Sequence, residues 1–269
     1  MADTEPRPLE LIRQDLDAID RDLVRLLSRR AELAIEVGHT KRKTGTPFFV
    51  PERERAIFEK LERENPGPLT NKQLHAIYRE IISAAIAAEK PLSVAFWGPL
   101  GTNTHQAALL TFGASAEMVA VDSIAETFRA VEQGHADYGV VPIENSSHGI
   151  VPETLDMFPQ TNVKVCAELY VPIHMHLVAT AERLSDIERV YAFGQPANQC
   201  KGWLREHLPQ AEIVDAAPTA RAAKMALNDP KGAAICNRLA AETVGIPILV
   251  EHIEDNPNNR TRFVVLGYN

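Results

Sequence analysis

The feature that most limits how this chain can fold is a heptad repeat of apolar residues near its start. Its members lie mostly three or four positions apart and are Leu9, Ile12, Leu16, Ile19, Leu23, Leu26, Leu33 and Val37. This spacing predicts one long helix with an apolar seam, from about Pro8 to Thr44, that ends before Gly45 and Pro47. Such a helix is ~55 Å long, whereas a compact unit of ~90 residues is only ~25 Å across. Because one domain cannot cover this seam, we predict a homodimer that forms through the long N-terminal helix.

The distribution of charge and glycine divides the chain into two parts. Residues 1–90 hold 16 of the 28 Lys and Arg residues and 16 of the 36 Asp and Glu residues, but only 3 of the 14 glycines. Residues 91–269 are less charged and alternate Val- and Ile-rich runs with glycines. The first composition is typical of helices and the second of α/β folds. We therefore predict a multidomain chain, with an all-α domain at 1–90 and an α/β domain at 91–269.

Composition also excludes several classes of protein. The sequence contains no apolar run near the ~20 residues that span a bilayer, and its polar start does not resemble a secretion signal. Cys166, Cys200 and Cys236 are widely spaced, which argues against a disulfide framework or a structural zinc site. A net charge of −8 disfavours nucleic-acid binding. We expect a cytoplasmic protein that binds neither membrane nor nucleic acid.

The heptad seam is interrupted by a cation, because Arg30 stands where a leucine is due. An arginine there can extend out of the seam or pair with a carboxylate. Alternatively, it is tolerated because an anionic ligand binds at this point. Lys41 follows near the same face. We expect a second helix to open at Pro51 and a third to cover Leu74–Glu89.

These positions resemble the all-helical chorismate mutase domain over roughly residues 8–90. The resemblance rests on Arg13, Arg30, Lys41 after Val37-Gly38, the Pro-Glu-Arg-Glu box with Arg53 and Glu54, and Glu89. It implies that the arginines bind the two carboxylates of chorismate and that Lys41 and a protonated Glu89 contact the ether oxygen. Arg13 and Arg30 are ~25 Å apart along one helix, so we expect one of them to come from the partner chain. A helical isochorismate-pyruvate lyase and a plain dimerisation bundle are the alternatives.

Two loops in the second part have the composition of anion-binding sites. The predicted strand 93–97 runs into Gly98-Pro-Leu-Gly-Thr and then a helix, an order that builds an anion-binding turn at a helix N-terminus. A strand from Tyr138 runs into Ile143-Glu-Asn-Ser-Ser-His-Gly, which suits a carboxylate. The alternation of strands, including one run over Val163–Val178, predicts two small parallel-rich sheets with a ligand cleft between them.

These motifs, with Gln195-Pro-x-x-Gln-Cys and Asn259-Arg-Thr-Arg-Phe, resemble prephenate dehydratase over residues 93–267. The resemblance implies a bilobal α/β domain like a periplasmic binding protein. One lobe would cover about 91–171 plus 247–269 and the other about 172–246. It implies Thr261 as the central catalytic residue and no cofactor or metal. The residues expected to line the cleft are Asn145, Ser146, Gln199, Thr102, Arg262 and Thr219, with Glu144 as a second candidate to assist the leaving hydroxyl.

The whole chain thus resembles the bifunctional chorismate mutase/prephenate dehydratases, whose substrates are chorismate and prephenate. Many relatives continue into a C-terminal regulatory domain that binds phenylalanine, and we expect this chain to be unregulated or truncated. Near the expected cleft, Ala192-Phe193 and Pro218 depart from the family pattern. A prephenate decarboxylase that gives a non-aromatic keto acid, or a non-catalytic protein that binds a dicarboxylate, therefore remain alternatives. His174 and His176 could share a face of one strand as zinc ligands, but we expect a structural role.

Overall fold

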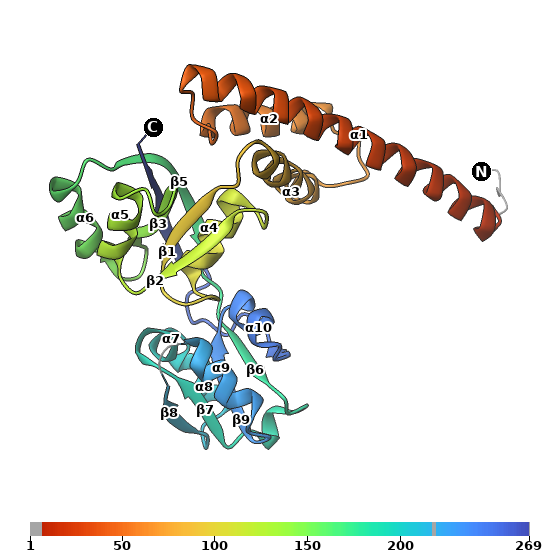
Figure 1. Cartoon of the computed structure of the whole chain (residues 1–269). Helices are drawn as coiled ribbons and strands as arrows, with labels where there is room; N and C mark the ends of the chain where they lie inside the picture. The colour runs from red at the N-terminus through yellow and green to blue at the C-terminus, as the bar shows by residue number, and fades with distance from the viewer. Residues whose placement is uncertain (1–6, 217–218, 269) are drawn as a thin grey trace. The chain divides into compact units, whose positions relative to one another are not determined.

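The structure is a computed structural model that describes residues 7–216 and 219–268. Two compact units divide the chain. The helical unit comprises the residues up to Pro91 together with Gly113–Ala116, and the α/β unit comprises Leu92–Phe112 and the residues from Glu117 onward. The fold class predicted from the sequence, a helical domain followed by an α/β domain, is confirmed (Figure 1). Among the described residues, no helix combines the length and apolar character needed to cross a membrane.

The helical unit consists of three helices with clear start and stop signals. These are α1 (Leu9–Thr44), α2 (Pro51–Glu64) and α3 (Asn71–Glu89). Gly45 ends α1 at a φ of 70°, a left-handed conformation that glycine adopts without strain. Thr70 opens α3 through a reciprocal capping box with Gln73, so that this helix begins three residues before the predicted Leu74. The first helix has the predicted length.

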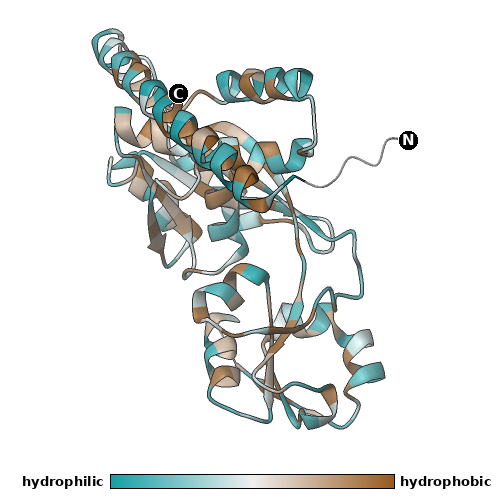
Figure 2. Cartoon of the chain, turned by 90° about the vertical axis from the view of Figure 1, so that its right-hand side faces the viewer, coloured by the Kyte–Doolittle hydropathy of each residue, from teal (hydrophilic) through white to brown (hydrophobic). Residues whose placement is uncertain are grey.

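The apolar seam of α1 is uncovered within its own chain. Only Gly38 is buried along the whole of α1, whereas Leu16, Leu23 and Leu26 expose 53%, 50% and 57% of their surface. The N-terminal half of α1 extends beyond α2 and α3 (Figure 1). Apolar residues recur between hydrophilic ones along this helix (Figure 2). A stripe of this extent on a monomer is typical of an interaction surface.

The α/β unit contains two mixed sheets. The first has the strand order β2-β1-β3-β11-β5, with β4 paired to β3. Its strands are β1 (Ser93–Trp97), β2 (Glu117–Val121), β3 (Tyr138–Asn145), β4 (Gly149–Ile150), β5 (Lys164–Pro172) and β11 (Arg260–Gly267), and its helices are α4 (Asn103–Phe112), α5 (Ile124–Glu132), α6 (Pro152–Met157) and a 3-10 turn at Phe158–Gln160. Its core includes Phe128, Val141 and Leu266.

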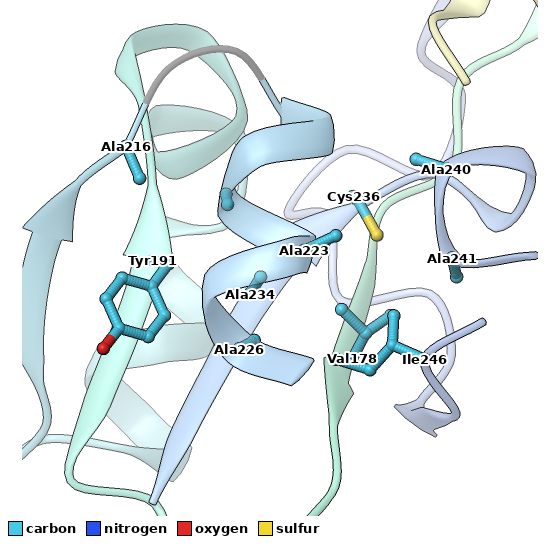
Figure 3. Packing of buried hydrophobic residues seen from close by; sticks show 11 residues of the cluster. Val178, Tyr191, Ala216, Ala223, Ala226, Ala234, Cys236, Ala240, Ala241 and Ile246 are labelled. Atoms are coloured by element: carbon cyan, nitrogen blue, oxygen red, sulfur yellow. The ribbon is translucent and has the colours of Figure 1, made fainter. Parts of the chain in front are cut away.

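The second sheet has the order β10-β6-β9-β7-β8. Its strands are β6 (His176–Ala179), β7 (Arg189–Ala192), β8 (Glu212–Asp215), β9 (Gly232–Cys236) and β10 (Ile248–Val250), and its helices are α7 (Gly194–Gln199), α8 (Lys201–His207), α9 (Thr219–Leu227), α10 (Arg238–Val244) and a 3-10 turn at Leu184–Asp186. Alanines dominate its core, where Ala223 and Ala226 of α9 pack with Ala234 of β9 (Figure 3). Because these side chains are small, the helix can lie close to the sheet.

Three details differ from the sequence prediction. Both sheets mix parallel and antiparallel pairs rather than being parallel-rich, because β11 lies antiparallel between β3 and β5 and because β6 is antiparallel to β9 and β10. The run Val163–Val178 is two strands in different sheets, since the chain crosses from one sheet to the other between Pro172 and His176. Strand β10 pairs with β6 and so belongs to the second sheet. The lobe boundary predicted at residue 247 had assigned these residues to the lobe of the first sheet.

Candidate active sites

A lysine and a glutamate meet at the end of the helical unit. Lys41 Nζ, in the last turn of α1, lies 3.1 Å from Glu89 Oε2, at the end of α3, and 3.0 Å from the carbonyl oxygen of Phe48. The side chains are only 18% and 8% exposed. Gly38 makes this meeting possible, because a Cβ at that position would lie 2.9 Å from the Cβ of Glu89. The structure therefore brings together Lys41 and Glu89, two of the predicted site residues, and Gly38 permits their contact.

The other cations of the helical unit are in different situations. Arg30 is half-buried, and its Nη1 donates to the carbonyl oxygen of Ile81 at 3.4 Å, a long bond that uses one of five N–H donors. Arg53 is exposed at the start of α2. Arg13 is exposed on α1 and lies ~42 Å along the helix axis from Lys41. Within one chain, Arg13 is therefore not part of the Lys41 cluster.

Glu54 forms an ion pair between two helices. It is buried, and one of its oxygens accepts a hydrogen bond from Arg79 Nη1 at 2.5 Å. Burial raises the pKa of Glu54 above its ordinary value, although Arg79 opposes the rise. The pair joins α2 to α3. The carboxylate that the sequence predicts as a substrate contact thus joins two helices within one chain, and its role in substrate binding stays a prediction.

A cavity of 660 Å³ lies in the α/β unit and is lined by strand residues of the first sheet and by residues of the helices, loops and crossings around the second. Its apolar walls include Trp97, Ile150, Phe193 and Phe263, and its polar lining includes Thr102, Asn145, Gln199, Thr219, Asn237 and Thr261. A lining of mostly apolar walls with a few convergent polar groups is typical of small-ligand sites. Of the predicted lining residues, Asn145, Gln199, Thr102 and Thr219 lie here together with Thr261.

The hydroxyl of Thr261 is held by a network across two paired strands. Thr261 of β11 stands opposite Asn145 of β3, and Asn145 Nδ2 donates to Thr261 Oγ1 at 2.8 Å. The amide orientation is fixed because Asn145 Oδ1 accepts the N–H of Ser147 at 2.9 Å. Asn145 Nδ2 also donates to Asn259 Oδ1 at 3.1 Å. Since Oγ1 accepts from Asn145, the Thr261 proton is available to another acceptor.

Ser146 supports this network rather than lining the cavity. Its Oγ donates to Asn259 Oδ1 at 3.3 Å and accepts the N–H of Arg260 at 3.0 Å. The loop after β3 is thereby joined to the segment that precedes Thr261.

Arg262 and Glu144 lie on the opposite side of the sheet from the cavity. Arg262 Nε donates to Glu168 Oε2 at 2.9 Å, and its guanidinium lies 5.8 Å from the ring centroid of Tyr170. Glu144 stands opposite Arg262 in the register of β3 and β11. Neighbouring residues of a strand point to opposite faces, so Thr261 and Asn145 face the cavity while these two residues do not. The predictions that Arg262 binds substrate and that Glu144 could assist the leaving group therefore do not fit the structure.

The side-chain amide of Gln199 is buried at the cavity without hydrogen bonds to the described residues. Both its Nε2 and its Oε1 are buried and lack a hydrogen-bond partner among the described residues. Leaving a buried amide unpaired costs ~1–3 kcal/mol per group. A ligand with both donor and acceptor atoms would remove this cost, so Gln199 marks where a polar substrate group fits.

The loop after β1 connects the two lobes of the α/β unit. Asn237 Nδ2 donates to Asn103 Oδ1 at 2.7 Å, and a Cβ at Gly101 would lie 2.9 Å from the Cα of Ala240. The φ of Gly101 is +89°, so glycine is required there for both reasons. Of the family departures, Phe193 lines the cavity and Pro218 lies outside the described residues. His174 and His176 do not share a strand, since only His176 belongs to β6.

Fold and sites together define a class of protein, an enzyme with a cation-bearing helical bundle fused to a two-lobed α/β unit whose mostly apolar cavity holds a few convergent polar groups. Residues 12–90 match the family model of chorismate mutase type II, and residues 94–269 match that of prephenate dehydratase. The bifunctional chorismate mutase/prephenate dehydratase of Aquifex aeolicus is 42% identical over 263 residues, which are 96% of this chain and 73% of that protein. The corresponding protein of Pseudomonas aeruginosa is 38% identical over 273 residues, covering 99% of this chain and 74% of its own.

A solved structure agrees with these matches. Prephenate dehydratase from Arthrobacter aurescens, crystallised with L-Phe, has a TM-score of 0.59 and 38% identity over 65% of this chain and 60% of its own. The chain belongs to the bifunctional chorismate mutase/prephenate dehydratases. It carries the chorismate mutase and prephenate dehydratase activities of phenylalanine biosynthesis, as the sequence motifs predicted.

Proposed function

We propose that the cavity of the α/β unit converts prephenate to phenylpyruvate with Thr261 as the hydrogen-bond donor to the departing hydroxyl. In this reaction the C–C bond to the ring carboxylate breaks, CO2 leaves, and the bond electrons complete the aromatic ring as the C–O bond breaks. The departing hydroxide takes up a proton and leaves as water. Thr261 is a weak acid, so it stabilises the developing charge by hydrogen bonding rather than by full proton transfer.

The observation that carries this assignment is the direction of the Thr261 hydroxyl. Asn145 donates to its oxygen, and Asn145 is itself oriented by Ser147, so the Thr261 proton is available toward the cavity. Gln199, Thr102 and Thr219 are proposed to orient the substrate carboxylates and carbonyl. Ser146 is proposed as a positioning residue.

The experiment that tests this proposal is product analysis on pure prephenate. Phenylpyruvate, detected by its absorbance in base, supports the assignment despite the departures at Ala192 and Phe193. A non-aromatic keto acid would instead indicate a prephenate decarboxylase, and binding without turnover would indicate a dicarboxylate-binding protein.

We further propose that the mutase site is shared between two chains of a homodimer. Lys41 borders a hollow of 390 Å³ whose lining comes from α1 and Thr46 alone and includes Leu33, Val37 and Thr40. The exposed seam of α1 continues along the same helix. A partner helix laid on this seam would cover the hollow and could bring the partner's Arg13 to Lys41, Arg30 and Arg53. Light scattering tests this, because a monomer at micromolar concentration would contradict both the dimer and the shared site.

Glu89 has two possible roles that one variant separates. In the structure its carboxylate pairs with Lys41, which supports a role in positioning the ammonium group toward the ether oxygen of chorismate. A protonated Glu89 could instead donate to that oxygen directly. If it does, mutase activity should fall with rising pH as Glu89 loses its proton, and Glu89→Gln should flatten the profile. An unchanged profile in this variant supports the positioning role.

The proposed location is the cytoplasm. Cys200 and Cys236 are buried and in no disulfide, and burial raises the pKa of each thiol to about 12. Thiols of this kind persist in a reducing compartment.

A further inference from the structure

Two histidines and a carboxylate meet where the chain crosses between the two sheets of the α/β unit. The first crossing, residues 173–175, joins β5 to β6, and the second, residues 251–259, joins β10 to β11. The crossings are bonded side by side, because Ile253 N donates to the carbonyl of Met175 at 2.8 Å and Ile173 N donates to that of Asn259 at 2.8 Å. His174 lies on the first crossing, and His252 and Glu254 lie on the second.

The potential ligand atoms of these three side chains all lie within 4.8 Å of one another. His174 Nδ1 is 2.7 Å from Glu254 Oε1, and His252 Nδ1 is 3.4 Å from the same oxygen. In a tetrahedral zinc site with metal–ligand bonds of ~2.0–2.1 Å, the ligand atoms are about 3.4 Å apart. One of the two separations equals this value and the other is shorter, so small side-chain rotations suffice to place all three around one ion.

The three groups are held in place by the atoms behind them. Glu254 is 2% exposed, and its Oε2 accepts the N–H of Met175 at 2.9 Å. Its Oε1 lies within hydrogen-bond distance of His174 Nδ1, so both oxygens of the carboxylate are fixed in position.

His252 is held in a conformation that non-glycine residues rarely adopt. Its φ is 55°, and it is the only non-glycine residue in the described part of the chain with a positive φ. Its N–H donates to His176 Nδ1 at 3.1 Å, and its Nε2 lies 3.9 Å from Glu251 Oε2. Metal-binding histidines commonly present their second nitrogen to a carboxylate, and backbone strain of this kind is concentrated at functional sites.

We propose that His174, His252 and Glu254 bind one divalent transition-metal ion that joins the two crossings. Two imidazoles and one carboxylate favour Zn²⁺, Co²⁺ or Ni²⁺ over Mg²⁺ or Ca²⁺. The side chains of His174 and His252 are 38% and 53% exposed, which gives an ion a path of entry and leaves room for water as a further ligand. Ile173 and Met175, the neighbours of His174, line the substrate cavity, so the site adjoins the cleft without being part of it.

The test is a titration of the metal-stripped full chain with Co²⁺ alone. Binding is measured by calorimetry and by the visible absorption of the bound ion. We expect one ion per chain with micromolar affinity, and a loss of at least about tenfold in affinity for His252→Asn and for His174→Asn. Asparagine suits the positive φ at position 252, so the first variant should fold normally. The matched control is His207→Asn. His207 is an exposed histidine that stacks on Trp203 and does not belong to the cluster of His174, His252 and Glu254.

Two results would overturn the proposal. One is the absence of saturable Co²⁺ uptake, which would reduce the cluster to a hydrogen-bonded hinge. The other is unchanged affinity in both His252→Asn and His174→Asn, which would place the bound ion elsewhere. The joining of the crossings has its own readout, because a bound ion should slow amide hydrogen exchange in residues 173–177 and 250–255 of the unaltered chain only. Uptake of the ion without slower exchange would contradict that part of the proposal.

Discussion

At the scale of single residues, the proposed dehydratase mechanism depends on how the hydroxyl of Thr261 is directed. Asn145 donates to the oxygen of Thr261, which leaves the Thr261 proton available to the substrate. We expect Thr261→Ala to lower kcat on prephenate about a hundredfold with little change in KM, because the donor acts mainly in the transition state. Thr261→Ser keeps the hydroxyl and should retain most of the activity. Steady-state kinetics on both variants checks this, and a rise in KM alone would make Thr261 a binding contact.

The residue scale also shows what the sequence could and could not predict. Thr261, Asn145 and Gln199 follow from motifs and lie together in the cavity. Strand alternation alone could have assigned Arg262 and Glu144 to the far face, since each is the neighbour of a cavity residue. The pairing of Glu54 with Arg79 could not be predicted, because 25 residues separate the two and their contact depends on how α2 packs on α3.

At the scale of elements, the approach of α1 to α3 depends on a missing side chain. A Cβ at Gly38 would lie 2.9 Å from the Glu89 Cβ. We expect Gly38→Ala to destabilise the helical unit by about 1–2 kcal/mol, because overpacking outweighs the helix propensity that alanine adds. It should also move Glu89 from Lys41 and lower mutase activity. Thermal unfolding and mutase assays measure both effects, and unchanged dehydratase activity is the internal control.

A second element-scale prediction concerns the turn that precedes β9. Asp229 accepts hydrogen bonds from Arg189 Nε and Nη2 and from the hydroxyl of Tyr191, all at 2.8 Å. The bond from Arg189 is the largest cause of a pKa of Asp229 well below its ordinary value. Since the folded pKa lies below the unfolded one, this stabilisation is present above the unfolded value near ~4 and is lost as pH falls below it.

Asp229→Asn should therefore lower the free energy of unfolding by about 2 kcal/mol at neutral pH. The difference between the variant and the unaltered chain should shrink as pH falls below ~4. Denaturant unfolding at several pH values checks this, and a difference that stays constant with pH would show that the charge of Asp229 does not matter.

Elements also mark the limit of sequence reasoning about topology. The long helix α1 was predictable because its heptad period extends over many turns. The crossing between β5 and β6 was not, because Ile173 and Met175 continue an apolar run through residues that belong to neither sheet. For the same reason His174 and His176 were assigned to one strand, and the partners of His174 were missed because they lie about 80 residues away.

At the scale of the whole molecule, the two activities should be separable by single substitutions. Arg30 belongs to the helical unit and Thr261 to the α/β unit. We expect Arg30→Ala to lower mutase activity about a hundredfold, the effect of losing a charge-assisted contact of ~3 kcal/mol, and to leave dehydration of added prephenate unchanged. Thr261→Ala should do the reverse. Parallel assays of both reactions on both variants test this, and loss of both activities in either variant would indicate coupling between the units.

The proposed dimer makes the sharpest prediction, because it assigns Arg13 and Lys41 of one mutase site to different chains. Arg13→Ala and Lys41→Ala should each be inactive as homodimers, since every site then lacks one cation. Subunits mixed under exchange conditions should regain activity, because a mixed dimer contains one site with Lys41 from one chain and the partner's Arg13. With random pairing, about one quarter of all sites are intact. The recovered mutase rate should therefore approach one quarter of that of the unaltered protein, measured as chorismate consumption.

A mixture of Lys41→Ala with Arg30→Ala serves as the control. In the proposed site Lys41 and Arg30 come from the same chain and only Arg13 comes from the partner, so no intact site should form in this mixture. Failure of the first mixture to recover activity, while light scattering shows that subunits have exchanged, would place Arg13 outside the shared site.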